Sequence, residues 1–410
     1  MTTARLIIFA LTYILIAVQQ FPGIRLNRPA ASLLGAVAMV TIGGLPMRDA
    51  YAAIDLDVIV FLLGVLLLTG YLELGGFFEW AAAHVVTRMR SPRTLLASII
   101  AISGVLSAFF INDTLCLVLP PLVIAAVRPL GLAPLPYVLA VALAANVGSA
   151  MAITGNPQNM LIGIASGQHY GSFLASLALP ALGGLIIVYA VIGRVFRREL
   201  DRPLPAERPR LHYDFDGSLV VRALLMFGAA LAGWLAGFSL PMVAITAAAI
   251  MIAIGGRDPA DAFGKVEWSL LLFFAAIFVV MRGVRDVPLI MSLTTSAAGE
   301  VQGSAWRDAA VVSGAMLVLS NLVSNVPAVV LWIPVVPALP DADFVWLVMA
   351  MSSTFAGNLT MVGSMANLIV AERAASRGLD VRFRDFIRTG VPITLLTLLW
   401  GVIVLVVLRR

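Results

Sequence analysis

Two clusters of amide side chains, one in each half of the chain, are the residues best suited to bind a solute or an ion. The first half holds Asn112-Asp113-Thr114 and Gly155-Asn156-Pro157-Gln158-Asn159, and the second half holds Ser324-Asn325 and Gly363-Ser364. The full set of candidate binding residues is Asn112, Asp113, Thr114, Asn146, Asn156, Asn159, Ser324, Asn325, Asn358, Ser364 and Asn367. Neutral amides coordinate Na⁺ through their oxygens and bind hydroxylated solutes through both polar groups.

Asp113 differs from the other candidates because it carries a charge inside an apolar stretch. Burial disfavours the charged form of a carboxyl group, which makes proton uptake and release near neutral pH feasible. The matching position in the second half is Val326, so the chain has one such acid and we predict one proton-coupling site. The alternative is that Asp113 only caps a helix that begins at Leu115.

The elements that carry these residues are predicted to be broken helices. Non-helical backbone at membrane depth is tolerated only where protein or a water-filled cavity covers it, and transporters use such breaks to bind ions and solutes. We predict two hairpin tips, at Asn112-Asp113-Thr114 and at Ser324-Asn325, and two interrupted helices, at residues 155–159 and 357–364. The alternative is that the amides and glycines only hold helices together.

The composition predicts an all-α polytopic membrane protein. Hydrophobic residues make up 61% of the 410 residues and charged residues 12%, and the mean hydropathy is +1.00, far above that of a soluble domain. The net charge of +5 comes from loop arginines and indicates orientation in a membrane, not nucleic-acid binding. The single cysteine, Cys116, excludes a disulfide framework, and no catalytic signature or metal-binding spacing is present, so we predict neither an enzyme nor a metal site.

An internal repeat divides the chain into two halves. Ile42-Gly43-Gly44 and Asp49-Ala50-Tyr51 recur 212 positions later as Ile254-Gly255-Gly256 and Asp261-Ala262-Phe263. We therefore predict a first repeat (residues 1–195), a linker (196–217) and a second repeat (218–410). Each repeat would hold about five transmembrane helices plus a re-entrant hairpin, and an odd number of spans would invert the two repeats.

The distribution of arginines predicts the orientation. The linker is arginine-rich, so we place it in the cytoplasm, together with the loop assigned to Arg25 and Arg28. Both termini are then periplasmic in a multi-pass protein of the cell inner membrane. Two amphipathic stretches, residues 77–90 and 287–297, are predicted to lie along the bilayer surface.

Several of these motifs resemble those of a known superfamily. Gly76-Phe77-Phe78-Glu79-Trp80-Ala81-Ala82, followed by His84-Val85, is similar to a segment of ArsB-type arsenite permeases. Asn112-Asp113-Thr114, Asn146-Val147-Gly148-Ser149 and the cluster at residues 155–159 are most similar to plant silicon efflux transporters. The whole chain resembles the superfamily of these proteins, the NhaD-type sodium/proton antiporters, the melanosomal P protein and the divalent-anion symporters.

The resemblance implies an elevator mechanism, in which a transport domain of hairpins and broken helices slides past a scaffold that dimerises. It also implies that Asn112 and Asn325 match the ion-binding tips of the family, where Na⁺ could bind. The divalent-anion symporters carry Ser-Asn-Thr at both tips, whereas this chain has Asn112-Asp113-Thr114 and Ser324-Asn325-Val326. That difference disfavours carboxylate transport.

The predicted function is proton-coupled efflux of a small hydroxylated metalloid, arsenite or silicic acid. The alternative is a Na⁺/H⁺ antiporter or a Na⁺-coupled transporter of citrate or another dicarboxylate. The expected partners are a small inorganic solute or anion, the lipid bilayer and a second copy of the chain. A cytoplasmic ATPase is left open, and no cofactor is expected beyond the coupling ion, H⁺ or Na⁺.

Overall fold

The computed structural model describes residues 2–18, 20–21, 24–203 and 213–409, and nearly all of its regular structure is helical. The helices of the first half are α1 (Thr2–Val18), α2 (Arg28–Thr41), α3 (Met47–Ala53), α4 (Leu56–Leu74), α5 (Phe77–Arg88), α6 (Pro92–Phe109), α7 (Asn112–Val127), α8 (Leu135–Ser149), α9 (Pro157–Ser166), α10 (Tyr170–Val195) and α11 (Arg197–Leu200), with short 3₁₀ turns η1 (Arg128–Leu130) and η2 (Ile153–Gly155).

The second half repeats the series α1–α10 in the same order. Its helices are α12 (Gly217–Leu235), α13 (Leu240–Ile254), α14 (Pro259–Lys265), α15 (Trp268–Arg285), α16 (Pro288–Gly299), α17 (Ala305–Val323), α18 (Asn325–Trp332), α19 (Ala342–Ala356), α20 (Met365–Ala375) and α21 (Phe383–Leu408), with 3₁₀ turns η3 (Val336–Ala338) and η4 (Met361–Gly363). The predicted surface stretches at residues 77–90 and 287–297 form α5 and α16.

One small feature departs from the all-α prediction. Strands β1 (Gln20–Phe21) and β2 (Ile24–Arg25) pair antiparallel between α1 and α2, with Gln20 opposite Arg25. From the distribution of arginines, the sequence analysis predicted that Arg25 and Arg28 lie in a cytoplasmic loop. That reading is wrong for Arg28, which is the first residue of α2 and only 7% exposed.

The chain is a multi-pass membrane protein. Among the described residues, seven helices are long and apolar enough to cross a membrane, namely α4, α6, α7 with η1, α10, α12, α15 and α21. Shorter apolar helices are α1, α2, α8, α13 and α19. Large apolar side chains are exposed on the outer helices, for example Ile186 on α10 and Leu225 on α12, which is expected where a helix faces lipid.

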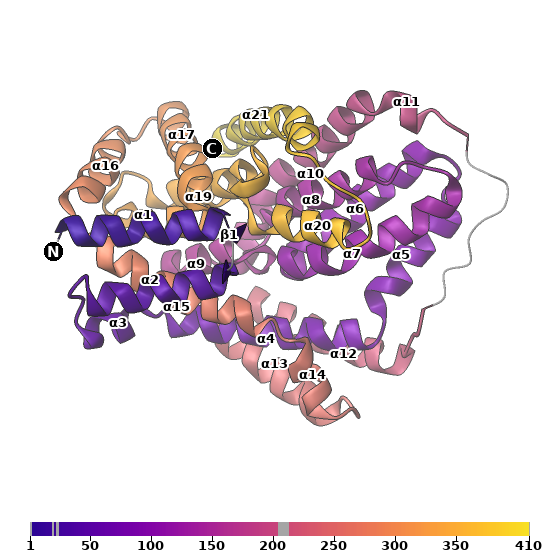
Figure 1. Cartoon of the computed structure of the whole chain (residues 1–410), viewed down its shortest axis with the longest axis horizontal. Coiled ribbons are helices and arrows are strands. Elements are labelled where there is room, and N and C mark those ends of the chain that lie inside the picture. Colours follow the sequence, from indigo (N-terminus) through magenta and orange to yellow (C-terminus); the bar gives the residue numbers. More distant parts are fainter. Residues whose placement is uncertain (1, 19, 22–23, 204–212, 410) are drawn as a thin grey trace.

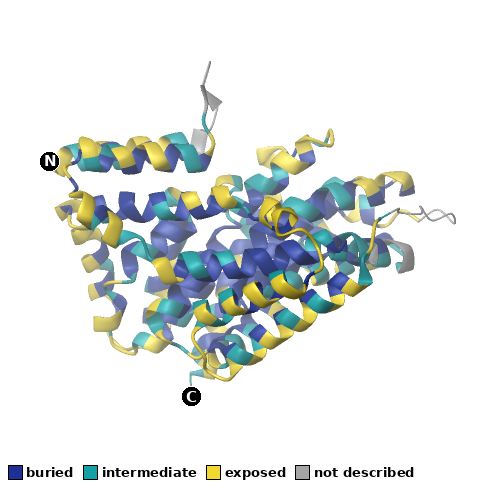
Figure 2. Ribbon diagram, turned by 90° about the horizontal axis from the view of Figure 1, so that it is seen from below, coloured by how far each residue is buried: buried dark blue, intermediate teal, exposed yellow. Residues whose placement is uncertain are grey.

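The helices form two groups (Figure 1). In the straight-helix bundle, α4 packs against α12, α13 and α14, and α2 packs between α1 and α15. In the broken-helix bundle, α6 packs against α8, α17 against α19, α10 against α21, and α7 against α20. Figure 2 shows that the buried residues concentrate in the middle of the molecule, with exposed residues around its rim.

Two ion pairs join the short helices α3 and α14 to longer helices of the straight-helix bundle. Lys265, the last residue of α14, bonds Glu73 near the end of α4 at 2.7 Å. Arg282 near the end of α15 lies 3.8 Å from Asp49 of α3. Each pair joins a residue of the first half to a residue of the second half. Because the groups are partly exposed, we expect each pair to contribute less than about 1 kcal/mol.

The close crossing of α6 and α8 depends on glycine. A Cβ atom at Gly148 would lie 2.1 Å from the carbonyl oxygen of Gly104, which is far too close for two non-bonded atoms. Small residues of this kind let membrane helices approach until their backbones touch. The contact holds α8, which leads directly into the break at residues 150–156, against α6.

We expect Gly148→Ala to destabilise the protein by about 2 kcal/mol, because α6 and α8 must move apart to admit the methyl group. Thermal unfolding of the purified protein in detergent measures the effect. The matched control is Gly228→Ala on α12, where a Cβ atom would meet nothing within 4 Å. The control should keep or slightly raise the Tm because alanine favours the helix. Equal melting temperatures for the two variants would contradict the proposed close contact.

Candidate functional site

The structure breaks its helices at the four places that the sequence predicts. Tip 1 (residues 110–114) separates α6 from α7, and tip 2 (residues 323–327) separates α17 from α18. Break 1 (residues 150–156) separates α8 from α9, and break 2 (residues 357–364) separates α19 from α20. At break 1 the residue types explain the restart: Asn156 caps α9 by accepting a bond from the backbone nitrogen of Asn159, and Pro157 occupies the first turn, where no amide hydrogen is needed.

Asn146, near the end of α8, is the centre of the hydrogen-bond network. Its amide oxygen accepts bonds from Asn112 of tip 1 (3.1 Å) and from Ser364 of break 2 (3.1 Å). Its nitrogen donates to the side-chain oxygens of Asn358 (2.8 Å) and Asn367 (2.9 Å). All five side chains are buried. One residue therefore joins tip 1 to break 2, across more than 200 positions of sequence.

Two amides hold the unwound backbone of the breaks. The amide nitrogen of Asn159 donates to carbonyl oxygens of break 1 and its flank, those of Ser149 (3.2 Å), Ala150 (3.3 Å) and Ala152 (3.1 Å). The nitrogen of Asn367, 208 positions later, donates to the carbonyl oxygens of Gly357 (2.8 Å) and Thr360 (3.2 Å). Gly357 and Thr360 are also 208 positions after Ser149 and Ala152. The same interaction therefore supports both breaks.

Contacts between the two halves are reciprocal. Ser364 of break 2 bonds Asn146 of α8. At the same offset of 208 positions, Ser364 matches Asn156 and Asn146 matches Thr354. These two residues are also bonded, since the Asn156 nitrogen donates to the Thr354 hydroxyl at 3.3 Å. Gln158 donates to the same hydroxyl at 3.2 Å. An approximate two-fold axis produces this kind of exchange, in which each half offers the other the same contact.

Tip 2 packs directly on break 2. With its nitrogen facing the carbonyl oxygens of Ser353 and Gly363, the Asn325 amide donates to both at 3.1 Å. A Cβ atom at Gly357 would lie 2.9 Å from the end of the Asn325 side chain, so glycine leaves room for this amide without displacing it. Ser324 beside it has φ +73° and ψ +161°, a conformation that is essentially restricted to glycine and costs a few kcal/mol at most.

Several buried oxygens of the site have no hydrogen-bond partner among the described residues. They include the side-chain oxygens of Asn112, Thr114 and Asn159. The hydroxyls of Ser107 on α6 and Ser320 on α17, which occupy matching positions five residues before each tip asparagine, are also without a partner. Buried polar atoms are normally satisfied, so the free oxygens of Asn112 and Thr114 at tip 1 are suited to a bound cation or a hydroxylated solute.

Asp113 occupies the second position of α7 and is 9% exposed. The helix begins at Asn112, so the alternative that Asp113 caps a helix starting at Leu115 is wrong. Its carboxylate makes no hydrogen bond to a described residue, and the charged groups within electrostatic range of it are Arg28 of α2 and Glu267, which precedes α15. The sequence analysis did not predict that Arg28 would act electrostatically on Asp113.

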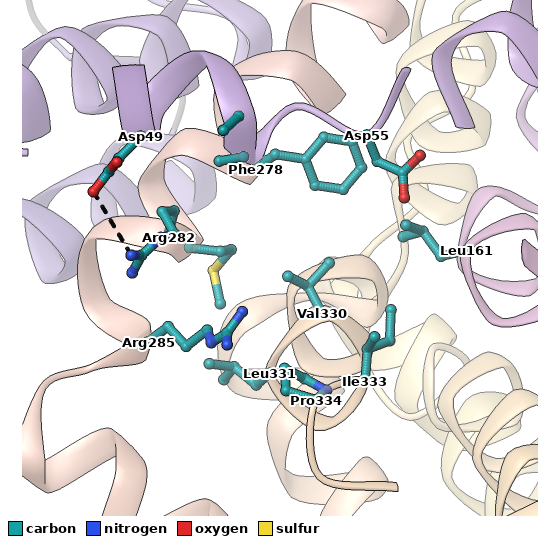
Figure 3. Close-up of a pocket in the computed structure, with 13 residues that line it drawn as sticks. Asp49, Asp55, Leu161, Phe278, Arg282, Arg285, Val330, Leu331, Ile333 and Pro334 are labelled. Atoms are coloured by element: carbon teal, nitrogen blue, oxygen red, sulfur yellow. Dashed lines mark ion pairs between the residues drawn. The ribbon is translucent and has the colours of Figure 1, made fainter. Parts of the chain in front are cut away.

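A cavity of about 420 Å³ lies between the two bundles (Figure 3). One wall carries Asp49 and Asp55 from the first half and Arg282 and Arg285 from the end of α15. The other wall is apolar and comes from α9, from α18 and from the residues after α18. None of the predicted site residues lines this cavity, and the sequence analysis did not identify it, because Arg282 and Arg285 lie opposite α9 and α18 only in the folded chain.

This arrangement of interrupted helices, buried amides and free oxygens inside a multi-pass bundle defines a membrane transporter, and not an enzyme. Residues 13–356 match the family described as citrate transporter (CitMHS). The chain belongs to the CitMHS citrate transporter family, within the ArsB/NhaD superfamily, which confirms the resemblance seen in the sequence.

Relatives and a solved structure extend along the whole chain. The chain is 27% identical to the 46 kDa membrane protein of Mycobacterium leprae, with 97% of this chain and 96% of the relative covered. It is 28% identical to the silicon efflux transporter LSI3 of rice (Oryza sativa subsp. japonica), with 96% and 95% covered. The crystal structure of the Alcanivorax borkumensis YdaH transporter has a similar fold, with a TM-score of 0.56, 14% identity, and 99% and 97% covered.

We expect Asn112→Ala and Asn325→Ala each to raise the half-saturating solute concentration about tenfold, a loss of about 1.4 kcal/mol of binding free energy. Each variant removes an amide at a tip that would otherwise contact the solute or its ion. Uptake into proteoliposomes at varied solute concentration measures the effect.

The control is Asn27→Ala, because Asn27 caps α2 and contributes about 1 kcal/mol to stability without belonging to the network. It should melt earlier than the wild type but keep its solute affinity. A control that lost affinity as strongly as the tip variants would show that the effect is only one of stability.

Proposed function

We propose that this transporter exports a small hydroxylated metalloid, arsenite or silicic acid, across the inner membrane in exchange for protons. The observation that carries the proposal is the buried group of neutral amide and hydroxyl side chains around tip 1, with free oxygens on Asn112 and Thr114. Each hydroxyl of such a solute can donate to a free oxygen and accept from an amide nitrogen. No Lys or Arg side chain hydrogen-bonds to these amides in the described part of the chain. The rice relative named as a silicon efflux transporter supports the same class of solute.

A second candidate is Na⁺/H⁺ antiport or Na⁺-coupled transport of citrate or another dicarboxylate. The family description favours citrate, and Arg28, buried near tip 1, is the side chain that could attract an anion. Against it, the carboxylate of Asp113 lies beside the place that an anion would occupy. Residues Asn112 and Asn325 are the proposed Na⁺ ligands in this case.

We further propose that the two halves are inverted repeats (residues 1–195 and 218–410), joined by a linker at 196–217, of which residues 204–212 lie outside the described residues. The matched series of elements and the reciprocal contacts of Asn146 and Thr354 support this. In Figure 1, α5 and α16, which match each other in the series, lie at opposite ends of the molecule, as inversion requires.

The straight-helix bundle is the proposed scaffold and the broken-helix bundle the proposed transport domain of an elevator mechanism. In the proposed orientation the termini face the periplasm. Arg409, near the C-terminus, forms an ion pair of 2.6 Å with Asp341, the residue just before α19. The N-terminal end of α1 lies beside α3 at one end of the molecule (Figure 1). The cavity lined by Arg282 and Arg285 would then be the outward vestibule. A homodimer through the scaffold remains part of this proposal.

Flux measurements with purified protein in proteoliposomes test the function. An imposed pH gradient should drive arsenite or silicic acid uphill, and citrate should not move. Asp113→Asn should abolish the pH-driven flux and leave downhill flux, because the amide has nearly the same shape but cannot carry a proton. Citrate accumulation without metalloid flux would favour the second candidate.

The matched control for this variant is Asp57→Asn. Asp57 holds the same second position of its helix, α4, but is exposed. It should keep the full response to the pH gradient. If Asp113→Asn kept that response as well, Asp113 would have no part in coupling.

The orientation is tested by cysteine labelling of intact cells with a membrane-impermeant maleimide. The native Cys116 is buried, so the background should be low. We expect Thr3→Cys to be labelled from outside and Arg202→Cys, exposed after α11, to be labelled only after the cells are opened. The reverse pattern would invert the proposed topology.

A further inference from the structure

Arg28 is a buried cation that reaches from the straight-helix bundle to the broken-helix bundle. It opens α2 and is 7% exposed, and its guanidinium donates to the Met365 sulfur at 2.8 Å. Met365 is the first residue of α20, directly after break 2. Arg28 therefore sits where one bundle would slide against the other in the proposed mechanism.

The guanidinium is poorly compensated at this place. Its Nε is buried without a hydrogen-bond partner among the described residues, and no carboxylate of those residues lies within ion-pair distance of it. A cation at the first turn of a helix also opposes the helix dipole. Burying an uncompensated arginine costs several kcal/mol, so an arginine kept in this position is expected to interact with charge elsewhere in the transport cycle.

The acids within electrostatic range of Arg28 both belong to the broken-helix bundle. They are Asp113 at tip 1 and Glu372 on α20. Besides Arg28, the titratable groups that act on or respond to Asp113 are Glu267, which precedes α15, and Cys116 on α7 itself. Arg28 is the cation among them, and it contacts Met365 of α20, which packs against α7, the helix of Asp113.

The comparison of the two halves points to the same pair. The position that matches Asp113 is Val326, and the position 212 residues after Arg28 is Leu240. The aspartate and the arginine are thus both present in the first half only. Asn112 and Asn159, by contrast, recur in the second half as Asn325 and Asn367.

We propose that Arg28 is the counter-charge of Asp113 and sets the pH at which this carboxyl group takes up and releases its proton. The inference rests on the proposed proton coupling. When α7 and α20 slide along α2, Asp113 changes its separation from Arg28. The proton, taken from water on one side, is held more weakly where the arginine is near and more strongly where it is far. Arg28 is a positioning residue here, since it acts on the solute only through Asp113.

The test is an infrared titration of the purified protein, which needs no transported solute. The absorbance of the protonated carboxyl, taken as wild type minus Asp113→Asn, gives the midpoint of Asp113 protonation. We expect Arg28→Gln to move this midpoint upward by about one pH unit, because a favourable positive charge is removed. Arg28→Lys keeps the charge and should leave the midpoint near that of the wild type.

Two further variants keep the test decisive. Glu372 is exposed, so Glu372→Gln should fold even where Arg28→Gln does not. It should move the midpoint downward, because Arg28 is freed from a competing carboxylate. Arg5→Gln removes another arginine, one that bonds the Gly43 carbonyl oxygen at 2.8 Å far from tip 1, and should change nothing.

The outcomes separate this inference from the proposed function. If Asp113→Asn abolishes pH-driven flux but neither Arg28→Gln nor Glu372→Gln moves the midpoint, the counter-charge is refuted and proton coupling stands. If Arg28→Gln and Glu372→Gln move the midpoint in opposite directions, the counter-charge stands whatever the solute. A shift of equal size in Arg5→Gln would overturn it, since the effect would then be one of net charge.

Discussion

The structure depends on satisfying backbone that is unwound in the middle of a membrane protein. The hydrocarbon interior offers no water, so every carbonyl freed at a break must find a donor within the chain. Asn159 and Asn367 provide such donors: Asn159 bonds carbonyl oxygens at the start of break 1 and just before it, and Asn367 bonds those of Gly357 and Thr360 in break 2. Asn146 then joins tip 1 to the network of break 2. Without these amides the interrupted helices would leave buried carbonyls unpaired, at a cost of several kcal/mol each.

The amides that hold the breaks also define what the site can bind. A carboxylate or an arginine in the place of Asn146 could not both donate and accept, whereas an amide does both and carries no charge. The network thereby uses most of its donors internally and leaves oxygens of Asn112 and Thr114 free at tip 1. Glycine has a related role: Gly357 leaves room for the Asn325 side chain, which reaches the carbonyl oxygens of Ser353 on α19 and Gly363 in break 2. Because neutral amides stabilise the unwound backbone, the proposed site would favour an uncharged or weakly charged solute.

The sequence predicted the positions of the breaks because they are local: asparagine, glycine and proline at matching places in two repeats leave the helix few alternatives. It could not predict the partners, since the contacts of Asn146 with Asn358 and Asn367 join residues more than 200 positions apart. Arg28 was misread for the opposite reason. A basic residue beside proline and asparagine is typical of a loop, and only packing places it in the interior. The cavity at Arg282 and Arg285 depends on α18 approaching α15, which no local pattern reveals.

The residues that recur in both halves differ chemically from those present in one half only. The shared residues, such as Asn112 with Asn325 and Asn159 with Asn367, are neutral, and the bonds of Asn159 and Asn367 to the backbone of their own breaks are the same in each half. In the proposed elevator mechanism such contacts would stabilise both end positions alike, and they give no direction to a proton. Direction requires a difference between the halves, and Asp113 and Arg28 are present in the first half only. A carboxyl group that approaches its counter-charge in one position and leaves it in the other would bind a proton with two affinities, which is the condition for coupling transport to a pH gradient.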